Sequence, residues 1–160
     1  MSEKKYVFRN ILVAAVTAVS LTACGSPAAP EDVREDWGRI SLCVPDGMFL
    51  TGGTLTNPED DGALWLQVEG EPQTFMTVII TDEDTARSDI AYTAGLEDGK
   101  NVSVKAGGKV WTGTGYTHGE DKGFVIAGTV DGIAYEVTGE GIGAKDEAVK
   151  TVLSSISKTG

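Results

Sequence analysis

The chain has 160 residues, of which 41% are hydrophobic and 23% charged, a composition typical of one ordinary globular domain. Its net charge is −11, and because residues 1–23 hold three basic residues against one acidic residue, the remainder carries −13. Nucleic acid is bound by basic patches, so this acidic balance argues against a nucleic-acid partner. It also disfavours nonspecific docking on anionic lipid.

The N-terminal segment is typical of a signal peptide. Residues 11–21 form an uncharged apolar run behind a basic start, and this run is shorter than the roughly 20 residues that a membrane-spanning helix needs. The run ends in Leu21, Thr22, Ala23 and Cys24, which resembles the lipobox of bacterial lipoproteins. An ordinary secretory signal, with Cys24 incidental, is the alternative.

The lipobox resemblance implies how the chain is processed and where it resides. In lipoproteins the cysteine thiol accepts a diacylglycerol group, and a signal peptidase then cuts before the cysteine. We therefore expect residues 1–23 to be removed and Cys24 to carry acyl chains such as palmitate. The domain is then extracytoplasmic and lipid-anchored at the cell membrane or outer envelope.

The second cysteine, Cys43, lies between two apolar residues of a predicted strand. Its simplest interpretation is a small buried hydrophobic residue, and a reactive thiol is the alternative. Because Cys24 is expected to carry lipid, no disulfide within the chain is expected.

The remaining sequence predicts a tether followed by one domain. Residues 24–38 are rich in Pro, Ala, Ser and acidic residues, which is typical of a flexible tether, and residues 39–160 are expected to form a single domain. Alternating apolar residues predict strands, with turns at 45–47, 70–73, 107–108 and 131–132. The strands are expected at 39–44, 64–68, 75–81, 102–104, 110–116, 124–130 and 133–137.

Two helices are predicted among these strands. Apolar residues every four positions favour a helix over residues 84–96, and Val149, Val152, Leu153 and Ile156 form the stripe of a second helix docked on a sheet. The fold class is therefore α+β, with a single antiparallel β-sheet packed by at least two helices.

The order of elements, the opening residues 40–47 (ISLCVPDG) and the closing residues 152–156 (VLSSI) resemble the PsbP-like superfamily. The resemblance covers about residues 39–158. It implies an antiparallel sheet packed by helices and, because members are accessory proteins of photosynthetic membranes or bacterial lipoproteins and generally not enzymes, a binding or assembly module. It assigns no catalytic residue.

No residue pattern specifies a reaction, and no catalytic residue, cofactor or metal ligand is predicted. His118 is the only histidine of the chain and lies beside a glycine-bounded polar turn, which favours an exposed position over a catalytic base. The acidic residues 57–62 lack the spacing of a helix-loop-helix calcium site, so a solvated loop is favoured over an irregular cation site.

The tryptophans Trp37, Trp65 and Trp111 are ambiguous. Trp65 and Trp111 are out of phase with their apolar strand neighbours, so either both sheet faces are covered or the rings reach the surface. Core packing is the expectation. In the alternative, Trp65, Trp111 and His118 contribute to a binding surface for an envelope protein, a peptide or a glycan.

Two functions follow from these observations. The first is a membrane-tethered, extracytoplasmic, non-enzymatic binding or accessory module. The second is an extracytoplasmic hydrolase that uses His118 with a nearby hydroxyl or carboxylate, and it requires His118 to lie at the base of a cleft.

Overall fold

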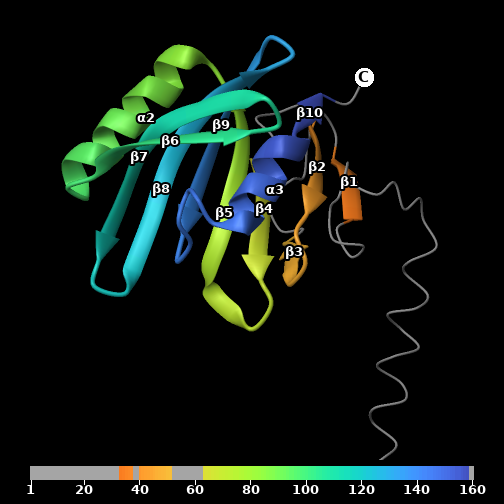
Figure 1. Cartoon of the computed structure of the whole chain (residues 1–160), viewed down its shortest axis with the longest axis horizontal. Helices are drawn as coiled ribbons and strands as arrows, with labels where there is room; N and C mark the ends of the chain where they lie inside the picture. The colour runs from red at the N-terminus through yellow and green to blue at the C-terminus, as the bar shows by residue number, and fades with distance from the viewer. Residues whose placement is uncertain (1–32, 38–39, 52–62, 159–160) are drawn as a thin grey trace, which may run out of the picture.

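The structure is a computed structural model that describes residues 33–37, 40–51 and 63–158 (Figure 1). Within these ranges the chain forms ten strands and two helices in the predicted order of strands, helix, strands, helix. The strands are β1 Val33–Trp37, β2 Ile40–Val44, β3 Met48–Leu50, β4 Ala63–Val68, β5 Glu71–Thr81, β6 Lys100–Ala106, β7 Lys109–His118, β8 Asp121–Val130, β9 Ile133–Glu140 and β10 Ser157–Lys158. The helices are α2 Glu83–Leu96 and α3 Glu147–Ser155.

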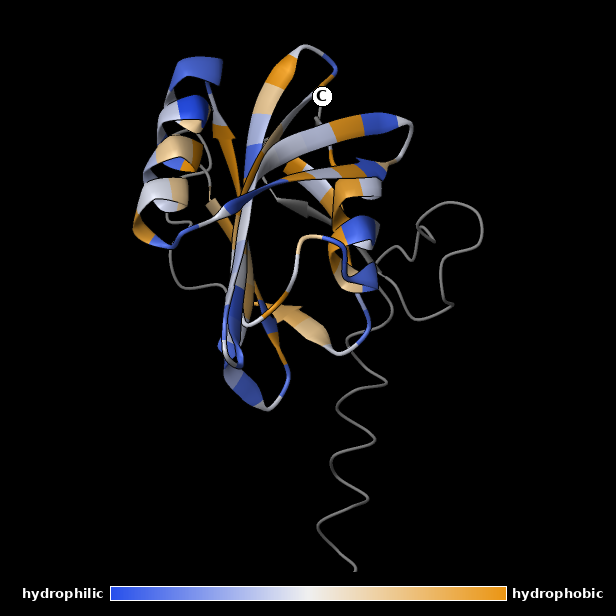
Figure 2. Cartoon of the chain, turned by 60° about the vertical axis from the view of Figure 1, so that its left-hand side comes forward, coloured by the Kyte–Doolittle hydropathy of each residue, from blue (hydrophilic) through white to orange (hydrophobic). Residues whose placement is uncertain are grey.

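The elements form three layers. The central layer is a seven-stranded antiparallel sheet in the order β3-β4-β5-β9-β8-β7-β6. Helix α2 lies on one face of this sheet, against β7, β8 and β9. Helix α3 and a smaller sheet, in the order β1-β2-β10, lie on the other side, as Figures 1 and 2 show.

The hydrophobic core lies between the large sheet and the layer of α3 and β2. Because side chains alternate along a strand, every second residue of β4, β5, β8 and β9 enters this core. Its largest members include Trp111, Tyr135 and Phe124, all at most 1% exposed. Trp111 fits because Gly128 faces it, where a Cβ atom would lie only 2.7 Å from the indole.

The two helices differ in how firmly their sequences attach them to the sheet. All four residues of the predicted stripe at the C-terminus, Val149, Val152, Leu153 and Ile156, are buried, which confirms the docked terminal helix. In α2 only Ala86 is buried. Helix α2 begins at Asp82, whose side chain accepts hydrogen bonds from the backbone N–H groups of Asp84 and Thr85.

The turns of the large sheet lie at residues that adopt a left-handed backbone conformation, with positive φ. Gly107 and Gly108 have φ values of 57° and 74°, and Asp131 and Gly132 have φ values of 51° and 79°. Both predicted turns therefore join their strands as two-residue hairpins.

Several boundaries differ from the sequence predictions. The α+β class with an antiparallel sheet and two helices is confirmed, but the single sheet is wrong, because β2 pairs with β1 and β10 in a separate sheet. Strand β1 also lies inside the predicted tether of residues 24–38, so residues 33–37 are not tether. The turn expected at 70–73 is shorter, since β5 already begins at Glu71.

Three predictions fall on residues outside the described ranges: the signal peptide, the lipid attachment site Cys24, and the acidic residues 57–62. Among the described residues, no helix has the length and apolarity needed to cross a membrane.

Candidate functional site

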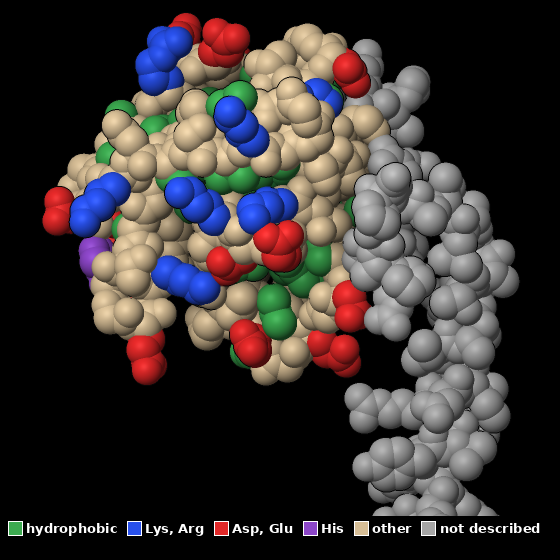
Figure 3. All heavy atoms as spheres, viewed as in Figure 1, with side chains coloured by type: hydrophobic (Ala, Val, Ile, Leu, Met, Phe, Trp, Pro, Cys, Tyr) green, Lys and Arg blue, Asp and Glu red, His purple; other side chains and the backbone are tan. Residues whose placement is uncertain are grey.

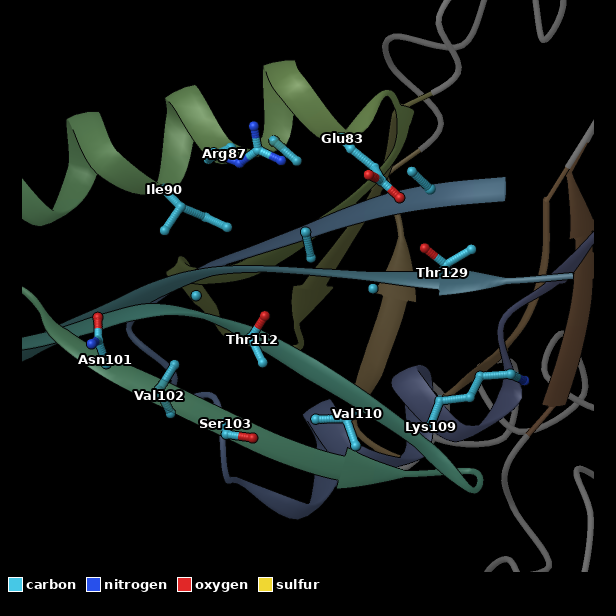
Figure 4. Close-up of a pocket in the computed structure, with 15 residues that line it drawn as sticks. Glu83, Arg87, Ile90, Asn101, Val102, Ser103, Lys109, Val110, Thr112 and Thr129 are labelled. Carbon is cyan, nitrogen blue, oxygen red and sulfur yellow. The ribbon is translucent and has the colours of Figure 1, made fainter. Parts of the chain in front are cut away.

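An open cleft of about 920 Å³ lies between α2 and the large sheet (Figure 4). Its floor consists of small residues on β7, β8 and β9, among them Gly113, Ala127 and Ala134. Because α2 buries only Ala86 against the sheet, space remains along its inner side. The polar residues that line the cleft are Glu83, Arg87, Asn101, Ser103, Lys109, Thr112 and Thr129.

The cleft therefore offers hydroxyl, amide and charged groups above an apolar floor. Its walls come from α2 on one side and from β6 and β7 on the other, as the labelled residues in Figure 4 show. Such a mixture suits reversible binding, in which a few polar groups orient a ligand and small apolar residues leave room for it.

A buried carboxyl group lies next to the cleft under α2. Glu136 on β9 is 5% exposed, and no donor among the described residues reaches its Oε2 atom. Burial, and then the charge and side-chain contact of Asp89 on α2, raise the pKa of Glu136 to about 7. The nearby charge of Asp89 therefore adds to burial in favouring the protonated form of Glu136.

The sequence analysis missed Glu136 and Asp89. Glu136 alternates with the buried Tyr135 and Val137, a phase that normally indicates a solvated face. Its burial results from α2 crossing that face, and the signal that could have indicated this is Asp89, which follows Ala86 by three residues and so shares its side of the helix.

His118 lies outside the cleft, beyond the end of α2. Its Nδ1 atom is 3.4 Å from Oε2 of Glu97, and its ring tilts against Tyr116 at a centroid distance of 5.8 Å. Half of the His118 side chain is exposed, as its turn position predicted. It therefore does not lie at the base of a cleft with a nucleophile, as the hydrolase interpretation requires.

Tyr116 connects this end of the sheet to β9. Its hydroxyl donates a hydrogen bond of 2.7 Å to Oε2 of Glu140, and its ring lies over Gly123, where a side chain would collide with it. Partial burial, followed by the contact with Glu140, raises the pKa of Tyr116. The phenol is therefore a neutral hydrogen-bond donor, not a phenolate nucleophile.

The structure separates the two tryptophans that were considered together. Trp111 is fully buried, in agreement with the core expectation. Trp65 is 37% exposed and stacks on Phe75 at a centroid distance of 5.3 Å, so core packing is wrong for Trp65. Phe49, 44% exposed, shares this face, because Gln67 pairs with Phe49 on one side and with Phe75 on the other.

The weak candidate surface of Trp65, Trp111 and His118 is therefore not a single surface. Trp65 belongs to a small aromatic surface of Phe49, Trp65 and Phe75 on β3, β4 and β5. His118 lies at the end of β7, four strands away from β4 in the sheet order, and Trp111 is in the core.

Cys43 is fully buried, which agrees with the interpretation of a small core residue. Its backbone N–H donates to Oγ of Ser155, which links β2 to α3. The structure has Cys43 in a disulfide, contrary to the expectation that no disulfide forms within the chain.

The described residues contain no group of three or more His, Cys, Asp or Glu side chains arranged to hold a metal ion. Residues 57–62, the stretch considered for calcium, are not among them.

The comparisons with known proteins give similarities to solved structures alone. Neither a family model nor a curated protein sequence matches the chain. Among solved structures, the chain is similar to the solution structure of cyanobacterial PsbP (CyanoP) from Synechocystis sp. PCC 6803, with a TM-score of 0.48 and 14% sequence identity. The superposition covers 87% of this chain and 99% of that one.

Proposed function

We propose that this protein is a lipid-anchored, extracytoplasmic binding module without enzymatic activity, attached to the membrane through Cys24. The observation that carries the binding function is the open cleft of about 920 Å³ beneath α2, whose lining is suited to holding a ligand. The anchor is supported by the sequence Leu21, Thr22, Ala23 and Cys24 after a short apolar run.

The position of His118 weighs against the hydrolase alternative. The only histidine of the chain pairs with Glu97 and packs on Tyr116, and it does not line the cleft. A general base has to lie within hydrogen-bond distance of the group it deprotonates, directly or through one water. The cleft thus lacks the one residue on which that alternative depended.

The cleft can be tested by site-specific photo-crosslinking in intact cells. A photoreactive amino acid at Thr129 of β8, which lines the cleft, should give a discrete adduct, whereas the same amino acid at the exposed Ala91 of α2 should not. Ala127→Phe should abolish the Thr129 adduct, because the larger side chain fills the floor of the cleft. Equal adducts from both positions, or an adduct that persists in Ala127→Phe, would contradict binding in the cleft.

A further inference from the structure

The hairpin of β6 and β7 is basic in an otherwise acidic chain. Residues 99–119 contain three lysines, Lys100, Lys105 and Lys109, and no aspartate or glutamate, although the chain carries a net charge of −11. Figure 3 shows lysine and arginine side chains spread over the face of the molecule on which β6 lies in Figure 1. This hairpin is therefore the place at which an anionic partner would meet the least repulsion.

Strand β6 is the last strand of the large sheet, so among the described residues only one of its edges is paired. The hairpin closes at the pair Ala106 and Lys109 around the Gly107–Gly108 turn. In a two-residue antiparallel hairpin the closing pair exchanges both hydrogen bonds, and such pairs alternate along the ladder. The N–H and C=O groups of Asn101, Ser103 and Lys105 therefore point away from β7, towards the open edge.

The side chains beside this edge are exposed as well. Asn101, Ser103 and Lys105 are all exposed, and the first two line the cleft. Lys100 marks the beginning of the edge and Lys109 its end, beyond the turn. Val110, 53% exposed, adds an apolar contact on the neighbouring strand. The edge thus combines backbone hydrogen-bonding groups with lysines near both ends.

We propose that the open edge of β6 binds an extended, acidic segment of a partner protein, which adds to the large sheet as a further strand. This inference rests on the proposed binding function and names its partner. The backbone of the segment would bond to Asn101, Ser103 and Lys105, and its carboxylates would lie near the lysines. Strand addition gives affinity through the main chain and selectivity through the side chains on either face of the added strand.

A second copy of this chain is a poorer occupant of the same edge. Pairing β6 with β6 of another molecule would bring Lys100 and Lys105 of both copies together, and like charges on neighbouring strands are destabilising. Lysines on an edge strand are a common protection against such self-association. The charge of the edge therefore selects an acidic strand.

The test uses the full-length protein in detergent micelles and a defined probe, a capped seven-residue peptide that alternates glutamate and valine. NMR spectra should show slowed amide exchange at Asn101, Ser103 and Lys105 when the peptide is added. A peptide with N-methyl groups on the residues that face β6 should not bind, because strand addition needs those N–H groups. Lys105→Glu should weaken binding by about fivefold, and the matched control Lys145→Glu, at an exposed site outside the hairpin, should not.

Three results would overturn the inference. The N-methylated peptide could bind equally well, Lys145→Glu could weaken binding as much as Lys105→Glu, or the peptide could fail to protect the β6 amides. Phosphatidylglycerol vesicles that bind the wild type more strongly than Lys105→Glu would assign the lysines to lipid instead. In each case the crosslink at Thr129, lost in Ala127→Phe, would still show whether the cleft binds a ligand, so the two proposals can fail separately.

Discussion

Glu136 is the buried ionisable side chain with the most direct consequence for stability. Its carboxyl group lies between β9 and α2, and the only charged group that faces it in the described part of the chain is Asp89. Burial of a carboxyl beside another carboxyl favours the protonated form, which is why its pKa is raised to about 7 from an ordinary value of 4.5. The folded protein therefore holds this proton at pH values at which the unfolded chain has lost it.

The free energy of unfolding should consequently fall as the pH rises from about 4.5 to about 7. In that range the folded state binds more protons than the unfolded state, so raising the pH favours unfolding. The total loss in the free energy of unfolding is at most about 3 kcal/mol. Glu136→Gln should remove this dependence and should be more stable than the wild type at pH 8. Urea denaturation of both proteins at pH 5 and pH 8 measures the difference.

Asp89→Asn provides the matched control for this prediction. It removes the neighbouring charge and leaves the burial of Glu136, so it should reduce the pH dependence without abolishing it. If Glu136→Gln and the wild type lose stability in parallel between pH 5 and pH 8, Glu136 is not the group responsible.

His118 makes contacts that contribute little to the stability of the fold. Its contact with Glu97 involves side chains that are 50% and 39% exposed, and exposed contacts of this kind contribute less than about 1 kcal/mol. We predict that His118→Ala has a free energy of unfolding within about 1 kcal/mol of that of the wild type, and that the variant retains the protein's role in the cell. Thermal denaturation and complementation of a deletion strain test this, and a folded variant that lost the role would revive the hydrolase interpretation.

At the scale of single elements, α3 buries more of its residues in the core than α2 does. Leu153 is 1% exposed and lies in the core with Val149 and Val152. We predict that Leu153→Ala lowers the free energy of unfolding by about 2–5 kcal/mol, the usual cost of removing a large core side chain. Chemical denaturation measures this, and a loss below ~0.5 kcal/mol would show that α3 is peripheral.

The sequence predicted those elements that carry their own periodic signal. The stripe of α3 and the alternation of β2, β4, β8 and β9 can be recognised because apolar residues recur at the period of each element. Strands β1, β3 and β10 were missed. Strand β1 has the composition of a tether, while β3 and β10, with three and two residues, are too short to show a period.

The candidate site was harder to predict, because it depends on how elements pack together. The cleft exists because α2 rests on the small side chain of Ala86, and no spacing in the sequence indicates that. The same crossing buries Glu136, which its place in the strand would leave in solvent. Trp65 and Trp111 both lie on strands next to an edge of the large sheet, and the sheet face distinguishes them. Leu64 and Leu66 occupy the core face of β4 and leave Trp65 on the other face, whereas Trp111 itself enters the core.

At the scale of the whole molecule, the proposed anchor makes the sharpest prediction. Cys24→Ser should leave residues 1–23 attached or release a soluble protein, because serine cannot form the thioether that holds the diacylglycerol. Two acyl chains at ~0.8 kcal/mol per buried methylene give stable attachment, which the acidic mature chain cannot replace by charge. Cell fractionation and mass spectrometry of the wild-type N-terminus test both points.

The expected mass is that of a chain that begins at an acylated Cys24. An unmodified cysteine there, a variant that is still cleaved and membrane-bound, or a disulfide that joins Cys24 to Cys43 in the purified protein would each contradict the anchor.

Strand β1 also limits how far such a protein can act from its membrane. It begins at Val33, so nine residues connect a lipid on Cys24 to the folded domain, and nine residues extend to about 30 Å at most. Strand β1 lies in the layer opposite α2, on the other side of the large sheet from the cleft (Figure 1). Under the proposed anchor, the partners of this domain would be proteins whose acidic segments come within reach of the same membrane surface.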